Sequence, residues 1–358
     1  MISSPDRRWK MPRIFGKQIG WKNIFSLVSI LFSLGILLYF CLSENGLITL
    51  LQQLHRFQAR WIVLAVFCML ADLFLDACLI YLFIRNRATD YRFPAAVKVC
   101  LAGHFYSAIT PFQSGGQPMQ IYLADRQGID PGSATSALVQ KFFVYQTGIT
   151  LYSLLAIFLQ IHFFRNLLPP TMWGLTYVGF AVQVAAAVFL LLISFDRKLT
   201  HKLLEWVSRL PIVKKHHGVI PAWEKQVDFF HQSNRQIFRN FRLLGKTYFL
   251  TFLQLTAIFL VPYCIFRAFD IGQASVIQMI CYQAFVMMVS SLFPLPGSAG
   301  AAETSFYTFF SSFFTPQTIK SADLLWRAIS YYFVILICAP FSGIGKGWKD
   351  TQKSAADP

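Results

Sequence analysis

Two stretches of this chain interrupt an apolar sequence with proline and glycine, and they restrict the fold more than any other feature. The first, residues 107–128, reads SAITPFQSGGQPMQIYLADRQG. Its apolar approach, from Val97 to Ile109, is too short to cross a bilayer, which takes about 20 residues. Proline removes a backbone donor, and glycine is expected to supply permissive backbone. The interrupting residues are Pro111, Gly115, Gly116 and Pro118.

The second stretch, residues 290–305, is built in the same way. It reads SSLFPLPGSAGAAETS and contains Glu303 just after the break. Irregular backbone at membrane depth is tolerated only where protein or a water-filled cavity satisfies its polar groups. The two stretches therefore predict re-entrant hairpins, over 95–118 and about 274–315, that form a transporter-type binding site. The sequence leaves open whether residues 300–315 complete a span instead.

The composition indicates a membrane protein. Of the 358 residues, 55% are hydrophobic and 13% are charged, which is typical of an all-α polytopic integral membrane protein and not of a soluble domain. The net charge of +16 does not predict nucleic acid binding. The basic residues cluster in loops between apolar segments, as the positive-inside rule describes.

About six full transmembrane helices are expected in addition to the two hairpins. The distribution of basic residues predicts that both termini are cytoplasmic and that the two hairpins enter from opposite membrane faces. Residues 196–246 hold eleven basic and four acidic residues, and we expect a cytoplasmic, partly amphipathic segment on the inner leaflet. Its charges either only set the topology or bind anionic headgroups. The expected spans are 23–42, 61–84, 134–161, 173–195, 247–268 and 324–344.

The predicted organisation is one membrane domain. A basic cytoplasmic N-terminus covers residues 1–22, the transmembrane domain covers 23–345, and a short cytoplasmic tail covers 346–358. No linker to a soluble domain is expected on either side.

No sequence motif predicts catalysis, a metal site or a cofactor. The seven cysteines lie in or beside apolar segments, with no C-x-x-C pair and no zinc-type histidine spacing. We expect them to be small buried residues without a disulfide framework. There is no Walker motif, nucleophile elbow, metalloprotease motif or nucleotide-binding glycine pattern, so ATP-driven pumping by this chain alone is not expected.

Charged side chains at membrane depth are costly, so each one is a candidate functional residue. Asp72 and Asp76 lie four positions apart on the second expected span and therefore share one face. They are expected either to line a path for a cationic headgroup or a proton-coupled step, or to form a structural pair with Arg327 or Lys141. The sequence does not decide between these alternatives.

The remaining candidates have a structural alternative as well. Glu303 is expected to contact substrate or to cap its own helix, and Arg327 to bind a lipid phosphate or to neutralise an acid. Lys141 and Arg126 are expected to reach the cytoplasmic surface, and His104 to be a satisfied polar residue. The complete set of candidate substrate-binding residues is Asp72, Asp76, Gly115, Gly116, Gln117, Arg126, Glu303 and Arg327.

Three motifs in this order carry a resemblance to a known family. They are Thr110-Pro111-x-x-x-Gly115-Gly116-Gln117-Pro118 with Arg126-x-Gly128, then Pro294-x-Pro296-Gly297-x-x-Gly300-x-x-Glu303, then Trp326-Arg327 with Tyr331-Tyr332. In them the chain resembles the flippase-like transmembrane domain of the lysylphosphatidylglycerol synthase family, also called multiple peptide resistance factors. The cytosolic aminoacyl-transferase domain of the full-length synthases is not part of this sequence. Many members have glutamate in place of Gln117 and a basic residue near Gln120.

The resemblance implies a function in a bacterial plasma membrane. The implied activity is the flipping of a phospholipid, above all lysyl-phosphatidylglycerol, which contributes to resistance against cationic peptides. Three alternatives stay open: a phosphatidylglycerol lysyltransferase as in the family name, an exporter of a polyprenyl-linked lipid, and a non-transporting partner of a separate aminoacyl-phospholipid synthase. Membrane phospholipids are the expected partners, and the oligomeric state, including a homo-oligomer, is open.

Overall fold

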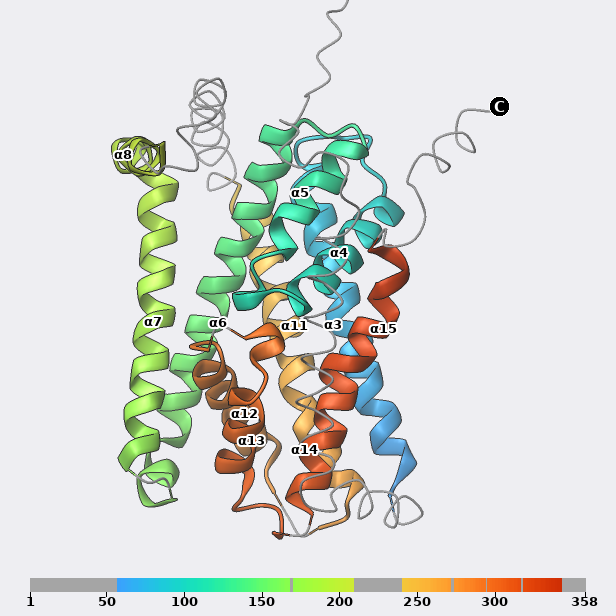
Figure 1. Ribbon diagram of the computed structural model, residues 1–358, viewed down its shortest axis with the longest axis vertical. Helices are drawn as coiled ribbons and strands as arrows, with labels where there is room; N and C mark the ends of the chain where they lie inside the picture. Colours follow the sequence, from blue (N-terminus) through green and yellow to red (C-terminus); the bar gives the residue numbers. More distant parts are fainter. Residues whose placement is uncertain are drawn as a thin grey trace, which may run out of the picture.

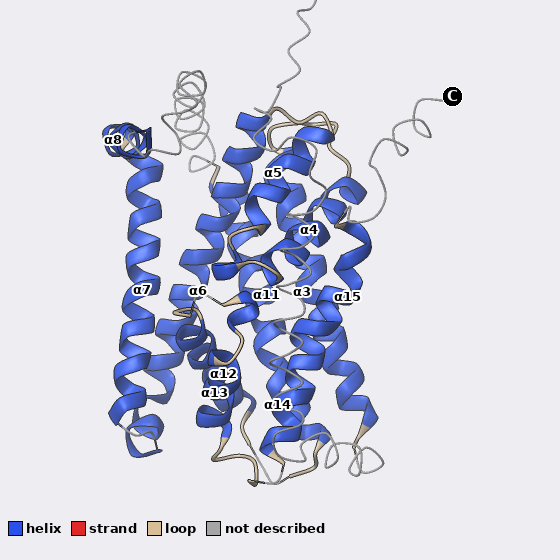
Figure 2. Cartoon of the chain, in the orientation of Figure 1, coloured by secondary structure: helices blue, strands red, loops and turns tan. Residues whose placement is uncertain are grey.

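A computed structural model describes residues 57–167, 170–208, 240–271, 274–293, 295–316 and 318–342, and within these ranges the chain forms helices and no strands (Figure 2). The expected first span, 23–42, the two terminal segments and residues 209–239 of the basic segment lie outside the described residues. The predicted all-α membrane fold is confirmed for the part that is described.

Long helices run along the bundle axis (Figure 1). Four of them are long and apolar enough to cross a membrane, over Ala59–Arg85, Pro131–Leu159, Phe241–Ala268 and Ile319–Phe341. They correspond to four of the expected spans, and α7 corresponds to a fifth, with a shorter apolar part over Thr176–Phe189. The long elements are α3 (Ala59–Arg85), α6 (Pro131–Leu167), α7 (Pro170–Phe195), α11 (Phe241–Ala268) and the successive pieces α14 (Ile319–Arg327), η5 (Ala328–Tyr332), α15 (Phe333–Cys338) and η6 (Ala339–Phe341).

Two broken hairpins lie between the long helices, where the sequence predicts them. They enter the bundle from opposite ends, and their breaks meet near its middle (Figure 1), where η2 contacts η4. The first hairpin is α4 (Phe93–Ala108), η2 (Pro111–Gln113) and α5 (Gly116–Arg126). The second is α12 (Val276–Ser290), η4 (Pro296–Ser298) and α13 (Ala301–Phe310).

The expectation that glycine supplies permissive backbone is wrong for the first break. Gly115 has φ −78°, and neither it nor Gly116 has a positive φ. The left-handed residues at this break are Phe112 and Gln113, with φ of 52° and 56°. In the second break, glycine does supply permissive backbone, because Gly297 and Gly300 have φ of 59° and 82°.

Gly116 instead allows a close approach of α4 and α5. A Cβ built on it would overlap Ser107 Oγ and lie 2.9 Å from the carbonyl oxygen of Gly103. A Cβ on Gly115 would lie 2.7 Å from Cγ2 of Thr110. The paired glycines of the motif are therefore required by packing across the hairpin.

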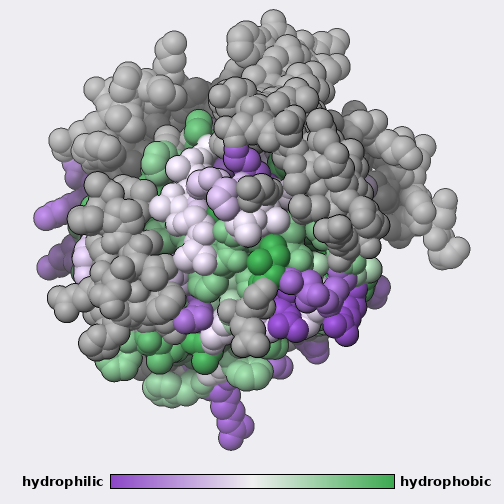
Figure 3. Space-filling model, turned by 90° about the horizontal axis from the view of Figure 1, so that it is seen from below, coloured by the Kyte–Doolittle hydropathy of each residue, from purple (hydrophilic) through white to green (hydrophobic). Residues whose placement is uncertain are grey.

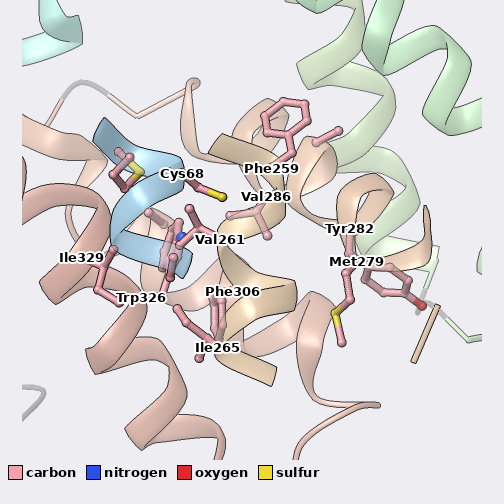
Figure 4. Close-up of a cluster of buried hydrophobic side chains, with 14 of the residues drawn as sticks. Cys68, Phe259, Val261, Ile265, Met279, Tyr282, Val286, Phe306, Trp326 and Ile329 are labelled. Atoms are coloured by element: carbon pink, nitrogen blue, oxygen red, sulfur yellow. The ribbon is translucent and has the colours of Figure 1, made fainter. Parts of the chain in front are cut away.

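The main hydrophobic core fills the space between α3, α11, α12, α13 and the last helix (Figure 4). Phe306 and Trp326 stack with ring centroids 4.9 Å apart and planes at 19°. This stacking packs the end of α14, the first piece of the last helix, against α13. A second core cluster joins α3, α4, α5 and α6. The first hairpin contributes to both clusters, since Leu101 and Phe105 of α4 belong to the main core.

The outer surface of the long helices is apolar. Phe67 on α3, Phe158 on α6 and Phe249 on α11 are 63%, 77% and 67% exposed, as expected of helices that face lipid. Seen from below, the described surface of the bundle end combines apolar residues with hydrophilic clusters (Figure 3).

The first part of the basic segment forms α8 (Arg197–Ser208). In Figure 1 this helix is seen nearly end-on above α7, so it runs across the bundle axis. Such an orientation fits the amphipathic helix on a membrane surface that the sequence predicts.

The packing of the first hairpin generates a stability prediction. Gly116→Val should destabilise the protein by about 1–3 kcal/mol, because the new side chain must displace Ser107 and the backbone of α4. Thermal unfolding in detergent measures the effect. Gly245→Val, on α11 with nothing within 4 Å of its Cβ position, is the control. Equal melting temperatures of the two variants would contradict the close approach.

Candidate functional site

The second hairpin and the last helix are joined by a buried ion pair. Arg327 Nε donates to Glu303 Oε1 at 2.7 Å, and both side chains are 7% exposed. Glu303 Oε2 accepts the backbone N–H of Gly300 at 2.6 Å, so the carboxylate also caps α13. Arg327 Nη1 donates to the carbonyl oxygen of Gly297 at 3.1 Å. The two structural alternatives for these residues, a cap and an ion pair, are both present.

This pair still has unused hydrogen-bonding capacity. Arg327 Nη2 is buried and has no partner among the described residues, and the same is true of Oδ1 of Asp323, one turn earlier. The guanidinium carbon lies 5.1 Å and 5.5 Å from the ring centres of Trp326 and Tyr331. Arg327 is thus oriented on three sides and keeps a donor for a further acceptor. Since buried polar groups normally form hydrogen bonds, the unpaired Nη2 of Arg327 is a candidate contact for a ligand.

A second charged cluster surrounds Asp76 on α3. Lys141 Nζ, from α6, lies 2.6 Å from Oδ1 and 2.7 Å from Oδ2. From α4, His104 Nε2 lies 3.2 Å from Oδ2, and Cys100 Sγ donates to the same oxygen at 3.3 Å. The expectation that Lys141 reaches the membrane surface is wrong, because its side chain is 12% exposed and pairs with Asp76. Cys100 is buried, as expected, but it also contacts the carboxylate.

Asp72 lies in the same cluster without a direct cation. Gln254 Nε2, from α11, donates to Asp72 Oδ1 at 2.9 Å and to Asp76 Oδ1 at 3.4 Å. Asp72 is 6% exposed. Of the two alternatives for the aspartates, the structural pair with Lys141 therefore applies to Asp76, whereas Asp72 is left with one amide donor among the described residues. Asp76, Cys100 and His104 each offer one possible metal ligand, and these three atoms lie within 4.8 Å of one another. Lys141, however, already neutralises the Asp76 carboxylate.

The last helix connects the two breaks. Tyr331, in the π-helical turn η5, donates its hydroxyl to the carbonyl oxygen of Ala108 at 2.9 Å, at the end of α4. A Cβ on Gly297 would fall on the Tyr331 ring, so this tyrosine contacts both breaks. π-helical turns inside α-helices are frequent at functional sites. Tyr331 follows Arg327 by four residues and belongs to the third sequence motif, but it is not one of the candidate substrate-binding residues predicted from the sequence.

The remaining predicted site residues are distributed over the first hairpin. Gly115 donates its backbone N–H to Thr110 Oγ1 at 2.8 Å, and Gln117 is half-buried at the start of α5. Arg126 is exposed at the end of α5 and donates to the Tyr122 hydroxyl at 3.1 Å. It lies at the opposite end of α5 from the break, so the structure does not bring it together with Glu303 and Arg327 (Figure 1).

Lys141, His104 and Gln254 complete the Asp76 cluster, and sequence reasoning did not include them in the site. Their signal in the sequence is a polar side chain within an otherwise apolar helix. The sequence offered Lys141, 65 positions from Asp76, as one of two possible partners of the aspartates, but it did not indicate Gln254, which is 182 positions from Asp72.

These features define a class of protein: a multi-pass, all-helical membrane protein in which two opposed broken hairpins meet beside buried charged clusters. The family model described as the lysylphosphatidylglycerol synthase TM region matches residues 26–338. The chain belongs to this family. It is also 23% identical, over 292 residues, to a UPF0104 membrane protein of Archaeoglobus fulgidus, which covers 77% of this chain and 84% of that protein. Family membership indicates a role that involves membrane lipids.

The Asp76 cluster generates a second prediction. Lys141→Met leaves the buried Asp76 without its cation and should lower the free energy of unfolding by about 3–5 kcal/mol. Asp76→Asn combined with Lys141→Met should cost less than the sum of the two single changes, because no charge is then left unpaired. Chemical denaturation in mixed micelles measures both, with Asp90→Asn in the exposed loop after α3 as control. Additive effects would show that the pair is not coupled.

Proposed function

We propose that this protein moves a phospholipid between the leaflets of a bacterial plasma membrane, with lysyl-phosphatidylglycerol as the preferred substrate. The observation that carries the proposal is the buried Arg327, whose Nη2 has no partner among the described residues at the point where the two breaks meet. Guanidinium groups bind phosphate oxygens in a planar, directional manner. A lipid phosphate is the acceptor that this donor would take.

The two charged clusters suit the two kinds of charge on an aminoacylated lipid, its anionic phosphate and its cationic amino groups. The phosphate would contact Arg327, and the amino group would contact carboxylates from Glu303, Asp72 and Asp76. The first hairpin would add Gln117 and the backbone of Gly115 and Gly116 at the break. The headgroup would pass between the hairpins while the acyl chains stay in the bilayer. Export of such a lipid reduces the negative surface charge and weakens the binding of cationic peptides.

The broken hairpins support this pathway. Half-helices that end at the membrane midplane are a recurring feature of transporter binding sites. We infer that the end of the bundle with α5 and α8 is cytoplasmic, since basic residues gather there, and that both termini share that side. Residues 23–345 would form one transmembrane domain, with Arg126 near its cytoplasmic surface.

The third prediction concerns transport. Liposomes with purified protein and lysyl-phosphatidylglycerol in one leaflet should show its rapid appearance in the other, measured by the accessibility of its amino group. Arg327→Ala and Glu303→Gln should reduce the rate to that of empty liposomes, because each removes one side of the buried pair. Arg242→Ala and Glu205→Gln, at exposed positions, should transport like the wild type.

The outcomes separate the alternatives. No movement above empty liposomes, with folded protein, would refute translocation of this lipid. Movement that neither substitution affects would keep translocation and remove the proposed site. Lipid mass spectrometry of cells that express the chain would test the transferase alternative, because newly formed lysyl-phosphatidylglycerol would favour an enzyme. Movement of a polyprenyl-linked lipid, or co-purification of a synthase without lipid movement, would favour the other two alternatives.

The fourth prediction concerns topology. Arg126→Cys and Ser312→Cys, both at exposed positions at opposite ends of the bundle, should react with a membrane-impermeant thiol reagent from opposite sides. Arg126→Cys should be labelled from the cytoplasm and Ser312→Cys from outside. The unaltered chain provides the background, because its described cysteines are buried or half-buried. Cytoplasmic labelling of both positions would contradict opposed hairpins.

A further inference from the structure

The Asp72 carboxyl differs from Asp76 and Glu303 because it has neither a cation nor a backbone N–H donor among the described residues. Asp76 contacts Lys141, and Glu303 contacts Arg327 and a backbone N–H. Asp72 receives one amide hydrogen bond from Gln254. A buried carboxylate with a single neutral donor in a membrane-embedded helix is strongly unfavourable, whereas a neutral carboxyl is not. The arrangement therefore favours a proton on Asp72.

The charge balance of the cluster is compatible with a proton on Asp72. Lys141 carries one positive charge, and Asp76 carries the one negative charge that neutralises it at 2.6 Å. With His104 neutral and Asp72 protonated, the cluster has no net charge. Ionisation of Asp72 requires one additional positive charge nearby, either an imidazolium at His104 or a cation from outside.

Ionisable groups from four helices surround Asp72. The titratable groups that face it are Asp76 on α3, Cys100 and His104 on α4, Lys141 and Tyr145 on α6, and Cys338 on α15, while α11 contributes the amide of Gln254. Four of the groups in this cluster are acids or bases: Asp72, Asp76, His104 and Lys141. His104 is the most exposed of them, since 28% of its side-chain surface is exposed. It is therefore the group of this cluster best placed to exchange a proton with its surroundings.

We propose that Asp72 carries an exchangeable proton, which it releases when an ammonium headgroup arrives, so that lipid movement is an exchange of one amine cation for one proton. This proposal depends on the proposed function for its substrate. The O–H bond of Asp72 breaks, the carboxylate pairs with the incoming ammonium, and the proton is taken up at Nδ1 of His104, because Nε2 already carries the hydrogen that it donates to Asp76 at 3.2 Å. The Asp76 carboxylate stabilises the imidazolium until Nδ1 gives the proton to water. No net charge enters the cluster, and the exchange couples transport to a proton gradient.

Infrared difference spectroscopy of the reconstituted full chain tests the proton directly. The wild type at neutral pH should show the carbonyl band of a protonated carboxyl, and lysyl-phosphatidylglycerol should weaken it. Asp72→Asn, which keeps an oxygen for Gln254, should lack the part of this band that responds to the lipid, whereas Asp323, a second buried carboxyl, is the same in both proteins. Asp90→Asn, an identical change at an exposed position, should retain both the band and its response. A wild-type band that Asp72→Asn leaves unchanged, or that the lipid leaves unchanged, overturns the proposal.

A transport measurement separates this proposal from the proposed function. In liposomes with a pH gradient, wild-type protein should accumulate the lipid in one leaflet and move protons, which a trapped pH-sensitive dye reports. Asp72→Asn should lose both the accumulation and the dye response. Wild-type movement that ignores the gradient overturns the coupling and leaves translocation intact. If no lipid moves at all, the proposed function fails, and the lipid response of the infrared band alone then supports or overturns proton release from Asp72.

Discussion

The backbone that is exposed where the two hairpins break must be satisfied within the protein, and the rest of the structure depends on this constraint. A helix that stops inside an apolar bundle leaves unpaired N–H and C=O groups, which cost several kcal/mol each in a membrane. Glu303 takes the N–H of Gly300, Arg327 takes the carbonyl of Gly297, and Tyr331 takes the carbonyl of Ala108. Two of these three side chains come from the last helix, which is why it lies against both breaks.

Two of the side chains that satisfy the backbone at the breaks, Glu303 and Arg327, are also charged groups that can contact a ligand. A carboxylate and a guanidinium that stabilise the break are also the groups that can contact a zwitterionic or aminoacylated headgroup. The Glu303–Arg327 pair is held by stacking of Phe306 on Trp326, so its geometry is fixed before any ligand arrives. The cluster around Asp76 is built differently: four helices supply its members, and Asp72 remains the one carboxyl there without a direct cation among the described residues.

Much of the fold could be predicted because its signals are local. The expected spans 61–84 and 247–268 agree with α3 and α11 within a few residues at most ends, since the length of an apolar run sets the length of a helix. Proline positions predicted both breaks. The role of Gly115 and Gly116 could not be predicted correctly, because a glycine required for close packing and a glycine required for a positive φ look identical in a sequence.

The sequence by itself determined an all-helical membrane protein, the position of its two breaks and the acids and bases that lie at membrane depth. These properties follow from apolar run length, from proline and glycine chemistry and from the cost of charge in lipid, which depend on neighbouring residues only. The tertiary structure alone decided the pairing. Lys141 joined Asp76 rather than the membrane surface, Arg327 joined Glu303, and Gln254 joined Asp72. Such contacts depend on which helices pack together, and that arrangement is a property of the whole chain.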